Sequence, residues 1–241
     1  MGCGHAYRRG MRLALLLFLL VGCDAGEAIV IDGRRVPVEA DVVLWDEPGG
    51  LDAHANQRFE ARFADTGRGT SSPFDARRID LVVLHYDTIG DSRGAFEILE
   101  KRDLSAHFLI DPDGTIFQAL DVTHQAWHAT VANPRSVGIE LAHTGAAPAE
   151  VGVEINGQTL TQTPYDPRQI AALRALLAAL DRELPNLPMA YPVGVDGSPL
   201  MRTMSEVELA NFRGVLGHWH VQTNKVDPGP ALNWDAVLPG G

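Results

Sequence analysis

The chain has 241 residues, of which 45% are hydrophobic and 21% are charged. Its 31 acidic and 20 basic side chains give a net charge of −11, and no cluster of Lys or Arg past the first residues would attract a phosphate backbone, which argues against nucleic acid as a partner. This length and composition predict one sizeable hydrophobic core, in a single domain with appendages rather than two full domains.

The N-terminal residues predict export. An apolar run from Leu13 to Val21 follows a basic flank and is too short to span a bilayer, as in a secretory signal. The stretch LVGC, ending at Cys23, resembles the lipobox of bacterial lipoproteins, in which the cysteine is acylated after cleavage. The other cysteine, Cys3, lies within the leader, so the mature chain is expected to have one thiol and no internal disulfide.

Two alternatives stay open for this leader: an ordinary signal peptide in which Cys23 is a chance residue, and a true start at Met11. We expect residues 1–22 to be a lipoprotein signal and Cys23 to carry a lipid anchor. The protein would then lie in the cell envelope of a bacterium, on the periplasmic side of the inner or the outer membrane.

A predicted hairpin and a long lead-in precede the main domain. Residues 29–40, IVIDGRRVPVEA, alternate around Asp32 and Gly33 and predict a small hairpin. Residues 46–78 contain few apolar residues and are expected to form a long lead-in along the surface. We therefore divide the mature chain into a lead-in and linker, residues 23–78, and a main domain, residues 79–238.

The main domain opens with a buried strand. Residues 79–86, IDLVVLHY, are almost continuously apolar, which is typical of a strand covered on both faces. Residues 92–103 predict a short helix with Ser92 as its N-cap. Residues 106–120 predict two strands joined through Asp113 and Gly114, and residues 136–143 predict another strand.

The second half of the domain adds an insertion, a long helix and a last strand. The insertion, residues 146–163, is expected to turn at Asn156 and Gly157. Residues 166–184 predict a helix that begins with Asp166 as N-cap and Pro167, and that buries a stripe of aliphatic residues. Residues 213–218 predict a final strand. The pattern indicates an α/β (α+β) fold with a mixed central sheet flanked by helices.

Several chemically active residues fall near predicted strand ends. His85 and His218 end two of these strands, Glu140 lies in a third, and Asp227 follows Lys225 in a Pro-Gly loop. Two imidazoles and a carboxylate are the ligand set of a catalytic zinc ion, which keeps a fourth position open. A nearby Glu and Lys would supply a general base and a cation for an oxyanion. Spacing alone leaves the site open, because nine histidines offer many triplets.

The order of the motifs is more specific. The segments LVVLHYD, SAHFLIDPDGTIFQALD, AWHA, NPRSVGIEL and LGHWHVQTNKVDPGPALNW, spread over residues 79–234, closely resemble the zinc-dependent N-acetylmuramoyl-L-alanine amidases of the peptidoglycan recognition protein superfamily. The resemblance implies that family's fold, one zinc ion, and hydrolysis of the amide between the lactyl group of N-acetylmuramic acid and L-alanine. Peptidoglycan or muropeptides would be the substrate, and we expect a monomer.

The resemblance also implies roles for individual residues. His85, His218 and Asp227 stand where the family holds zinc. Glu140 stands at the position of its general base, and Lys225 at that of the lysine that stabilises the oxyanion. Some relatives have a tyrosine where this chain has Ala106, so Glu140 and Lys225 are expected to carry the chemistry.

Five further residues are expected to contact substrate in the family's cleft: His107, Trp127, His128, Asn133 and Arg135. Arg135 suits a carboxylate of the stem peptide because its guanidinium binds such groups bidentately. Outside the family context, His107 and His128 would be interpreted as hydrogen-bonded structural residues.

Three other histidines have no assigned role. His220 is expected on the opposite face of a continuing strand from His218, on the surface or behind the ligands, although an exchange of roles with His218 stays open. We interpret His124 and His143 as surface groups.

Two other functions fit the same residues. One is a non-catalytic module that binds peptidoglycan, and the other is a zinc peptidase that cleaves a different amide of the stem peptide. Retention of all three ligand positions argues against the first. The absence of an HExxH motif argues against a metalloprotease of that type.

Overall fold

The computed structural model describes residues 27–55, 59–61 and 76–239. Its centre is a six-stranded sheet with the strand order β12-β5-β9-β6-β7-β3. The strands are β3 (Val42–Leu44), β5 (Leu81–Tyr86), β6 (Phe108–Ile110), β7 (Ile116–Gln118), β9 (Ser136–Leu141) and β12 (Gly214–Gly217). Strands β12, β5, β9 and β6 run parallel, whereas β7 is antiparallel to β6. The predicted mixed sheet is confirmed.

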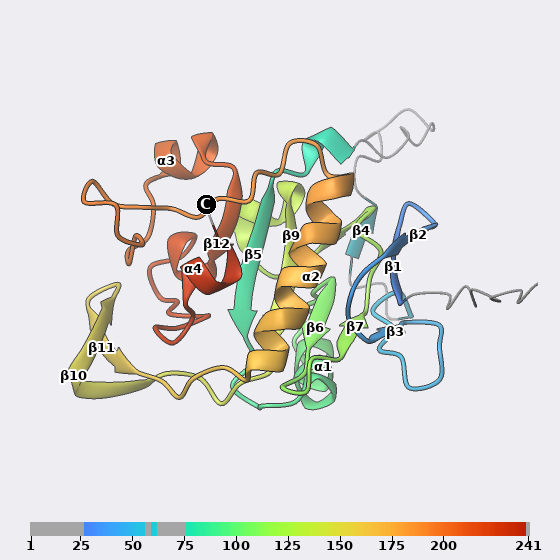
Figure 1. Ribbon diagram of the computed structural model, residues 1–241, viewed down its shortest axis with the longest axis horizontal. Coiled ribbons are helices and arrows are strands. Elements are labelled where there is room, and N and C mark those ends of the chain that lie inside the picture. The colour runs from blue at the N-terminus through green and yellow to red at the C-terminus, as the bar shows by residue number, and fades with distance from the viewer. Residues whose placement is uncertain (1–26, 56–58, 62–75, 240–241) are drawn as a thin grey trace, which may run out of the picture.

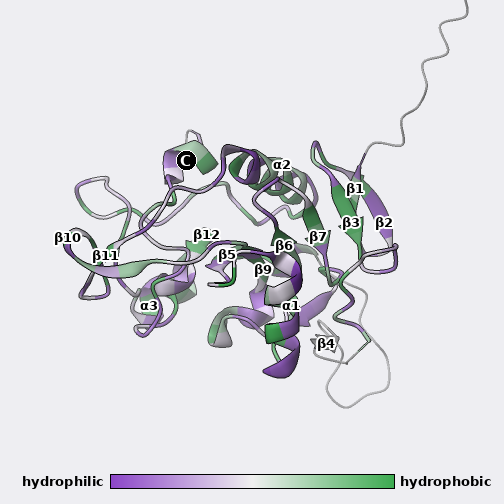
Figure 2. Ribbon diagram, turned by 90° about the horizontal axis from the view of Figure 1, so that it is seen from below, coloured by the Kyte–Doolittle hydropathy of each residue, from purple (hydrophilic) through white to green (hydrophobic). Residues whose placement is uncertain are grey.

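Helices cover both faces of this sheet. Helix α2 (Pro167–Glu183) crosses one face, and α1 (Ser92–Lys101) lies on the other (Figures 1 and 2). Val82 and Leu84 of β5 belong to the same hydrophobic cluster as Leu173 of α2. Leu81 and Val83 belong to a second cluster on the opposite face. Strand β5 is therefore buried on both faces, as its continuous apolar sequence predicts.

Of the two predicted helix N-caps, one is confirmed and the other is wrong. Helix α2 begins as predicted, with Asp166 accepting a hydrogen bond from the Arg168 N–H and Pro167 in the first turn. Helix α1 is capped by Asp91, which accepts from the Gly94 N–H, so the prediction of Ser92 as N-cap is wrong. The Ser92 N–H instead donates to Asp111 at 2.7 Å, a partner from a distant loop that local sequence does not reveal.

Both predicted hairpins are present. Strands β1 (Ala28–Ile31) and β2 (Arg34–Pro37) join through Asp32 and Gly33, which have φ angles of 53° and 69°. Strands β10 (Ala147–Ile155) and β11 (Gln158–Thr161) join through Asn156 and Gly157, with φ angles of 48° and 77°. The second hairpin stands away from the central sheet (Figure 1).

The remaining elements are short. They are β4 (Phe59–Ala61), η1 (Ala76–Arg78), β8 (His124–Ala126), η2 (Thr130–Arg135), α3 (Glu206–Asn211), η3 (His218–His220) and α4 (Trp234–Val237). Strand β4 pairs with β8, so the lead-in contributes a strand to a small two-stranded sheet. Within the described residues, no helix is both long and apolar enough to cross a membrane. The predicted signal peptide and Cys23 lie outside the described residues.

Candidate functional site

Three parallel strands bring the candidate residues to one edge of the sheet. His85 lies near the carboxyl end of β5, and His218 directly follows β12. Glu140 of β9 is the register partner of His85. Paired residues of neighbouring strands project to the same face, and His85 shares its face with Leu81 and Val83, opposite α2. A mainly parallel sheet commonly builds its binding site at this carboxyl edge.

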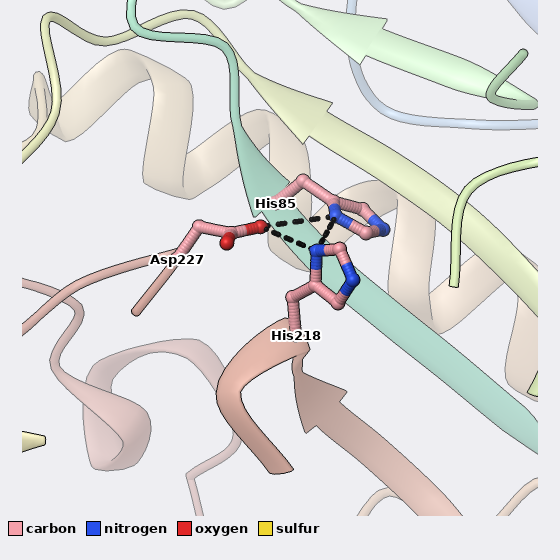
Figure 3. Close-up of side chains that lie close together, drawn as sticks. All are labelled: His85, His218 and Asp227. Atoms are coloured by element: carbon pink, nitrogen blue, oxygen red, sulfur yellow. Dashed lines mark hydrogen bonds and ion pairs between the residues drawn. The ribbon is translucent and has the colours of Figure 1, made fainter. Parts of the chain in front are cut away.

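The three predicted ligands converge. Nδ1 of His85, Nδ1 of His218 and Oδ2 of Asp227 each lie 3.0 Å from the other two (Figure 3). All three side chains are buried. His85 comes from β5, whereas His218 and Asp227 come from a single segment after β12. The three ligand atoms, which form a triangle, are therefore supplied by one strand of the sheet and one loop segment.

Outer hydrogen bonds favour one set of ring tautomers for the two ligand histidines. Nε2 of His218 lies 2.7 Å from Oε1 of Gln222, an oxygen that only accepts, so Nε2 is protonated and Nδ1 presents a lone pair. Nε2 of His85 lies 3.0 Å from Nδ1 of His128, whose Nε2 is 3.1 Å from the Ser136 hydroxyl. In the matching tautomers, His85 donates to His128 and His128 donates to Ser136. The Nδ1 lone pairs of both ligand histidines then point at Asp227.

This donor set fits a zinc ion. Three lone-pair atoms at such separations repel one another unless a cation or proton lies among them. Tetrahedral zinc with N and O ligands at ~2.0–2.2 Å separates its ligand atoms by about 3.4 Å, so the 3.0 Å triangle would need only a small expansion. Ligand histidines normally donate their second ring N–H to a fixed partner, as both do here.

The electrostatics favour the metal-binding protonation states. Burial lowers the pKa of His85 to about 4, and the neighbouring His218 adds to this shift. Burial acts to raise the pKa of Asp227, but the adjacent rings of His218 and His85, which donate hydrogen bonds to it when their Nδ1 atoms are protonated, outweigh burial and hold the pKa well below the ordinary value. A neutral imidazole and an ionised carboxylate are the forms that bind metals.

Glu140 is a different kind of carboxyl group. Burial raises its pKa well above the ordinary value, and the carboxylates of Asp227 and Asp87 add to the shift. Its Oε2 is buried and has no hydrogen-bond partner among the described residues. A buried, unpaired carboxyl oxygen beside a ligand set is a strong candidate for a group that exchanges protons with substrate or water.

A cavity of about 200 Å³ connects these groups. Its wall includes the three ligands, Glu140, Lys225 and His128, with aliphatic side chains of α1 on one side. Lys225 makes no ion pair with any residue in the described part of the chain. The structure therefore brings together all five residues expected to bind metal or do chemistry.

Most of the residues expected to contact substrate do not line this cavity. Of the five, only His128 is on the cavity wall. His107 is fully buried, with Nδ1 accepting from the Gly138 N–H and Nε2 near the His124 carbonyl. Asn133 accepts hydrogen bonds from the backbone N–H groups of His128 and Ala129. Both side chains thus support the backbone, and their predicted substrate contacts are not supported.

Arg135 and Trp127 also lie elsewhere. Arg135 directly precedes β9, at the amino end of the sheet and thus opposite the site. Its guanidinium pairs with Asp80 and donates to the Phe212 carbonyl at 2.6 Å, so it is not available for a stem-peptide carboxylate. The half-buried Trp127 is bound through its backbone N–H to the Ser105 hydroxyl at 3.0 Å and is not part of the cavity wall.

The predicted position of His220 on a continuing strand is wrong, which leaves its other predicted place, behind the ligands, and the prediction of His143 as a surface group is wrong. The chain turns into η3 at His218, so His220 does not continue a strand and is buried, where its Nδ1 accepts from the Gly217 N–H. Burial lowers the pKa of His220 to about 4. His143 is also buried, beside the Thr163 carbonyl, and His124 is half-buried.

Four residues of the site were not singled out from sequence: Gln222, Ser136, Gly138 and Asp87. Gln222 follows His218 by four positions, a helical spacing that signals contact only once η3 is known. Asp87 directly follows β5, and its Oδ2 is buried without a hydrogen-bond partner among the described residues. Because Asp87 directly follows a strand that the sequence predicts, its place at the carboxyl edge of the sheet could have been predicted from the sequence.

Comparison with known families gives one match over most of the domain. The Amidase_2 family model, described as N-acetylmuramoyl-L-alanine amidase, matches residues 75–230. A curated relative is the 1,6-anhydro-N-acetylmuramyl-L-alanine amidase AmpD of Salmonella typhimurium, which is 29% identical over 146 residues. The match covers 60% of each chain, so the chain spans less than two thirds of the length of this relative.

Solved structures show more distant likeness. The Escherichia coli amidase AmiD, in complex with anhydro-N-acetylmuramic acid-L-Ala-D-γ-Glu-L-Lys, is 22% identical with a TM-score of 0.48, covering 72% of this chain and 60% of that one. AmpDh3 of Pseudomonas aeruginosa, in complex with anhydromuramic pentapeptide, is 23% identical with a TM-score of 0.49, covering 72% and 64%.

The packing of Gly138 against His128 generates a prediction. A Cβ at position 138 would lie 2.7 Å from Cγ of the His128 ring, so Gly138→Ala must displace the ring that orients His85. Loss of an outer hydrogen bond of this kind weakens metal binding by about 10–100-fold. We expect such a loss of zinc affinity, measured by competition with a chelator of known affinity.

Gly194→Ala is the matched control, since its Cβ would approach the flexible Asp196 side chain at 3.0 Å and would meet Ser198 only at an ordinary contact distance of 3.7 Å. Wild-type zinc affinity in Gly138→Ala, with His128 still hydrogen-bonded to His85, would contradict the role given to this glycine.

Proposed function

Because the chain belongs to the N-acetylmuramoyl-L-alanine amidase family, we propose that it hydrolyses the amide between the lactyl group of N-acetylmuramic acid and L-alanine. One arrangement supports this most strongly: the buried ligands His85, His218 and Asp227 share a cavity with Glu140 and Lys225. The name of the AmpD relative, an amidase of anhydro-muramyl substrates, supports peptidoglycan or muropeptides as the substrate class.

We propose that one zinc ion is the resident cofactor, held by His85, His218 and Asp227. Such an ion supplies Lewis acidity, which makes a water molecule more acidic and polarises an amide carbonyl. The protein's own contribution is to keep His85 neutral and Asp227 ionised, and to orient the two ligand rings through Gln222 and His128.

Glu140 then transfers the proton. Its carboxylate takes a proton from the attacking water as the new C–O bond forms at the amide carbon. Its raised pKa makes it a stronger base than an ordinary carboxylate, and lets it give the same proton to the departing nitrogen. The C–N bond breaks, and the second proton of the water passes from the new carboxyl group to the amine, leaving a carboxylate on the lactyl group and an ammonium group on L-alanine.

Lys225 is placed to stabilise the charge on the carbonyl oxygen. The ammonium lies on the same cavity wall as Glu140 and makes no ion pair within the described residues, so its charge is available to substrate. A fixed cation in a small, partly closed cavity stabilises an oxyanion more than the same cation would in water.

We also propose that the protein works at a membrane surface in the cell envelope. The support is the LVGC stretch ending at Cys23, preceded by a short apolar run and a basic flank. A lipid on Cys23 would hold the domain beside its substrate, on the periplasmic side of the inner or the outer membrane. The first described strands would then lie between the anchor and the catalytic residues, with β3 already part of the central sheet through its pairing with β7.

Glu140→Gln tests the proton transfer. The amide keeps the shape of the side chain and cannot act as a base, so kcat should fall by about 10²–10⁴-fold. Zinc content, measured by elemental analysis of the purified protein, should stay at one ion per chain, because Glu140 is outside the ligand triangle. Glu150→Gln, an exposed change on β10, is the control. Retention of full activity in Glu140→Gln would sink the mechanism.

Cys23→Ser tests the anchor. The hydroxyl cannot take up the lipid, so labelling by a radioactive fatty acid should be lost and the protein should leave the membrane fraction of bacteria expressing the full chain. Unchanged labelling and fractionation in this variant would overturn the proposed lipid attachment.

A further inference from the structure

One irregular segment carries three of the five active-site residues. His218, Lys225 and Asp227 all lie within residues 218–231, where the only regular element is the single turn η3. A segment without a strand ladder or a long helix has few hydrogen bonds of its own to fix its backbone. Precise convergence of His218 and Asp227 on His85 therefore needs support from elsewhere in the fold.

Asn156, at the tip of the β10–β11 hairpin, supplies much of that support. Its Nδ2 donates to the carbonyls of Lys225 at 2.9 Å, Trp219 at 3.2 Å and Gln222 at 3.3 Å. Its Oδ1 accepts from the backbone N–H and the hydroxyl of Thr203, at 2.7 and 3.1 Å. One amide side chain thus ties together the segment that carries His218 and Lys225.

The backbone at this position also suits asparagine. The φ angle of Asn156 is 48°, in the left-handed region that Asn tolerates better than most residues. The hairpin packs only near this tip: Ile155 and Leu160 are buried, whereas Val151 is 88% exposed. The buried end of the hairpin is therefore the end that contacts the segment with His218 and Lys225.

A second contact holds the other end of the same segment. The Tyr165 hydroxyl and the Gln162 amide donate to the Pro228 carbonyl at 2.6 and 3.1 Å, directly after Asp227. Gln162 also accepts from the Ala231 N–H at 2.9 Å. The insertion and the residues that follow it thus bracket Asp227 on one side and His218 on the other.

We propose that Asn156 is a positioning residue, and that the β10–β11 insertion acts as a brace that holds the ligand segment in its zinc-binding geometry. The proposal rests on the proposed zinc site, and not on which amide bond is cut. It gives the insertion a role in the reaction centre, although no atom of the insertion lines the cavity.

The first test is Asn156→Gly. Glycine adopts the left-handed turn without strain, so the change removes the side-chain hydrogen bonds and keeps the hairpin. In the purified full-length protein, stripped of metal and retitrated against a competing chelator, zinc affinity should fall by about 10-fold or more. Val151→Ala, on the exposed part of the same hairpin, should bind zinc like wild type.

Cobalt gives a readout that loss of stability alone would not move. The visible absorption bands of Co²⁺ in the site report ligand geometry, so Asn156→Gly should shift or weaken them at a temperature where the protein is folded by circular dichroism. Asn156→Asp is a second variant, because it keeps an acceptor for Thr203 but loses all three donated hydrogen bonds. It should show the same changes even if the glycine variant does not fold.

The outcomes separate the two proposals. Wild-type zinc affinity and cobalt bands in folded Asn156 variants, with a wild-type protein that binds zinc, would overturn the brace and leave the proposed function intact. A wild-type protein that binds no zinc would overturn both. Reduced zinc affinity in the Asn156 variants alone would support the brace.

Discussion

The structure depends on keeping three lone-pair atoms 3.0 Å apart inside the protein, where water cannot screen their repulsion. A cation among His85, His218 and Asp227 would turn this repulsion into attraction. Without a metal ion, this repulsion destabilises the folded state. The packing and hydrogen bonds of the surrounding chain offset it, because they keep the three ligands in place. A metal ion at this site would therefore stabilise the folded state as well as enable the proposed chemistry.

Two parts of the fold hold the site residues in position, and they do so in different ways. The parallel ladder of β12, β5 and β9 fixes His85 and Glu140 in register on one face, and α2 seals the other face. The segment after β12 has no such ladder, and its backbone carbonyls are instead bound by Asn156 and Tyr165. The rigid half of the site is therefore built by strand pairing, and the irregular half by contacts from the insertion and the residues that follow it.

Sequence patterns predicted the parts of this design that are local. Strand β5 and helix α2 are visible in their apolar periodicity, and both hairpins in their turn residues, because one short segment contains the whole signal. The five residues of the proposed chemistry were identified by resemblance, whereas their spacing alone left them among many histidine triplets.

The failed predictions share a physical reason. Arg135 lies only five positions from Glu140, yet at the opposite end of β9, because a strand advances about 3.3 Å per residue. His107 and His220 are occupied by backbone groups that approach only in the folded chain. Tertiary structure determines which groups a polar side chain contacts. A single sequence shows the side chain but not the distant groups that will bind it.

The most direct test is mass spectrometry of a purified disaccharide-peptide after incubation with the soluble chain that begins after Cys23. The reaction should be run as purified, after treatment with a chelator, and after zinc is restored. Release of an intact sugar with a free lactyl carboxylate and an intact stem peptide, lost with the chelator and regained with zinc, is the predicted result. Cleavage of a different amide, or no cleavage by a folded and zinc-loaded protein, would contradict the proposed function.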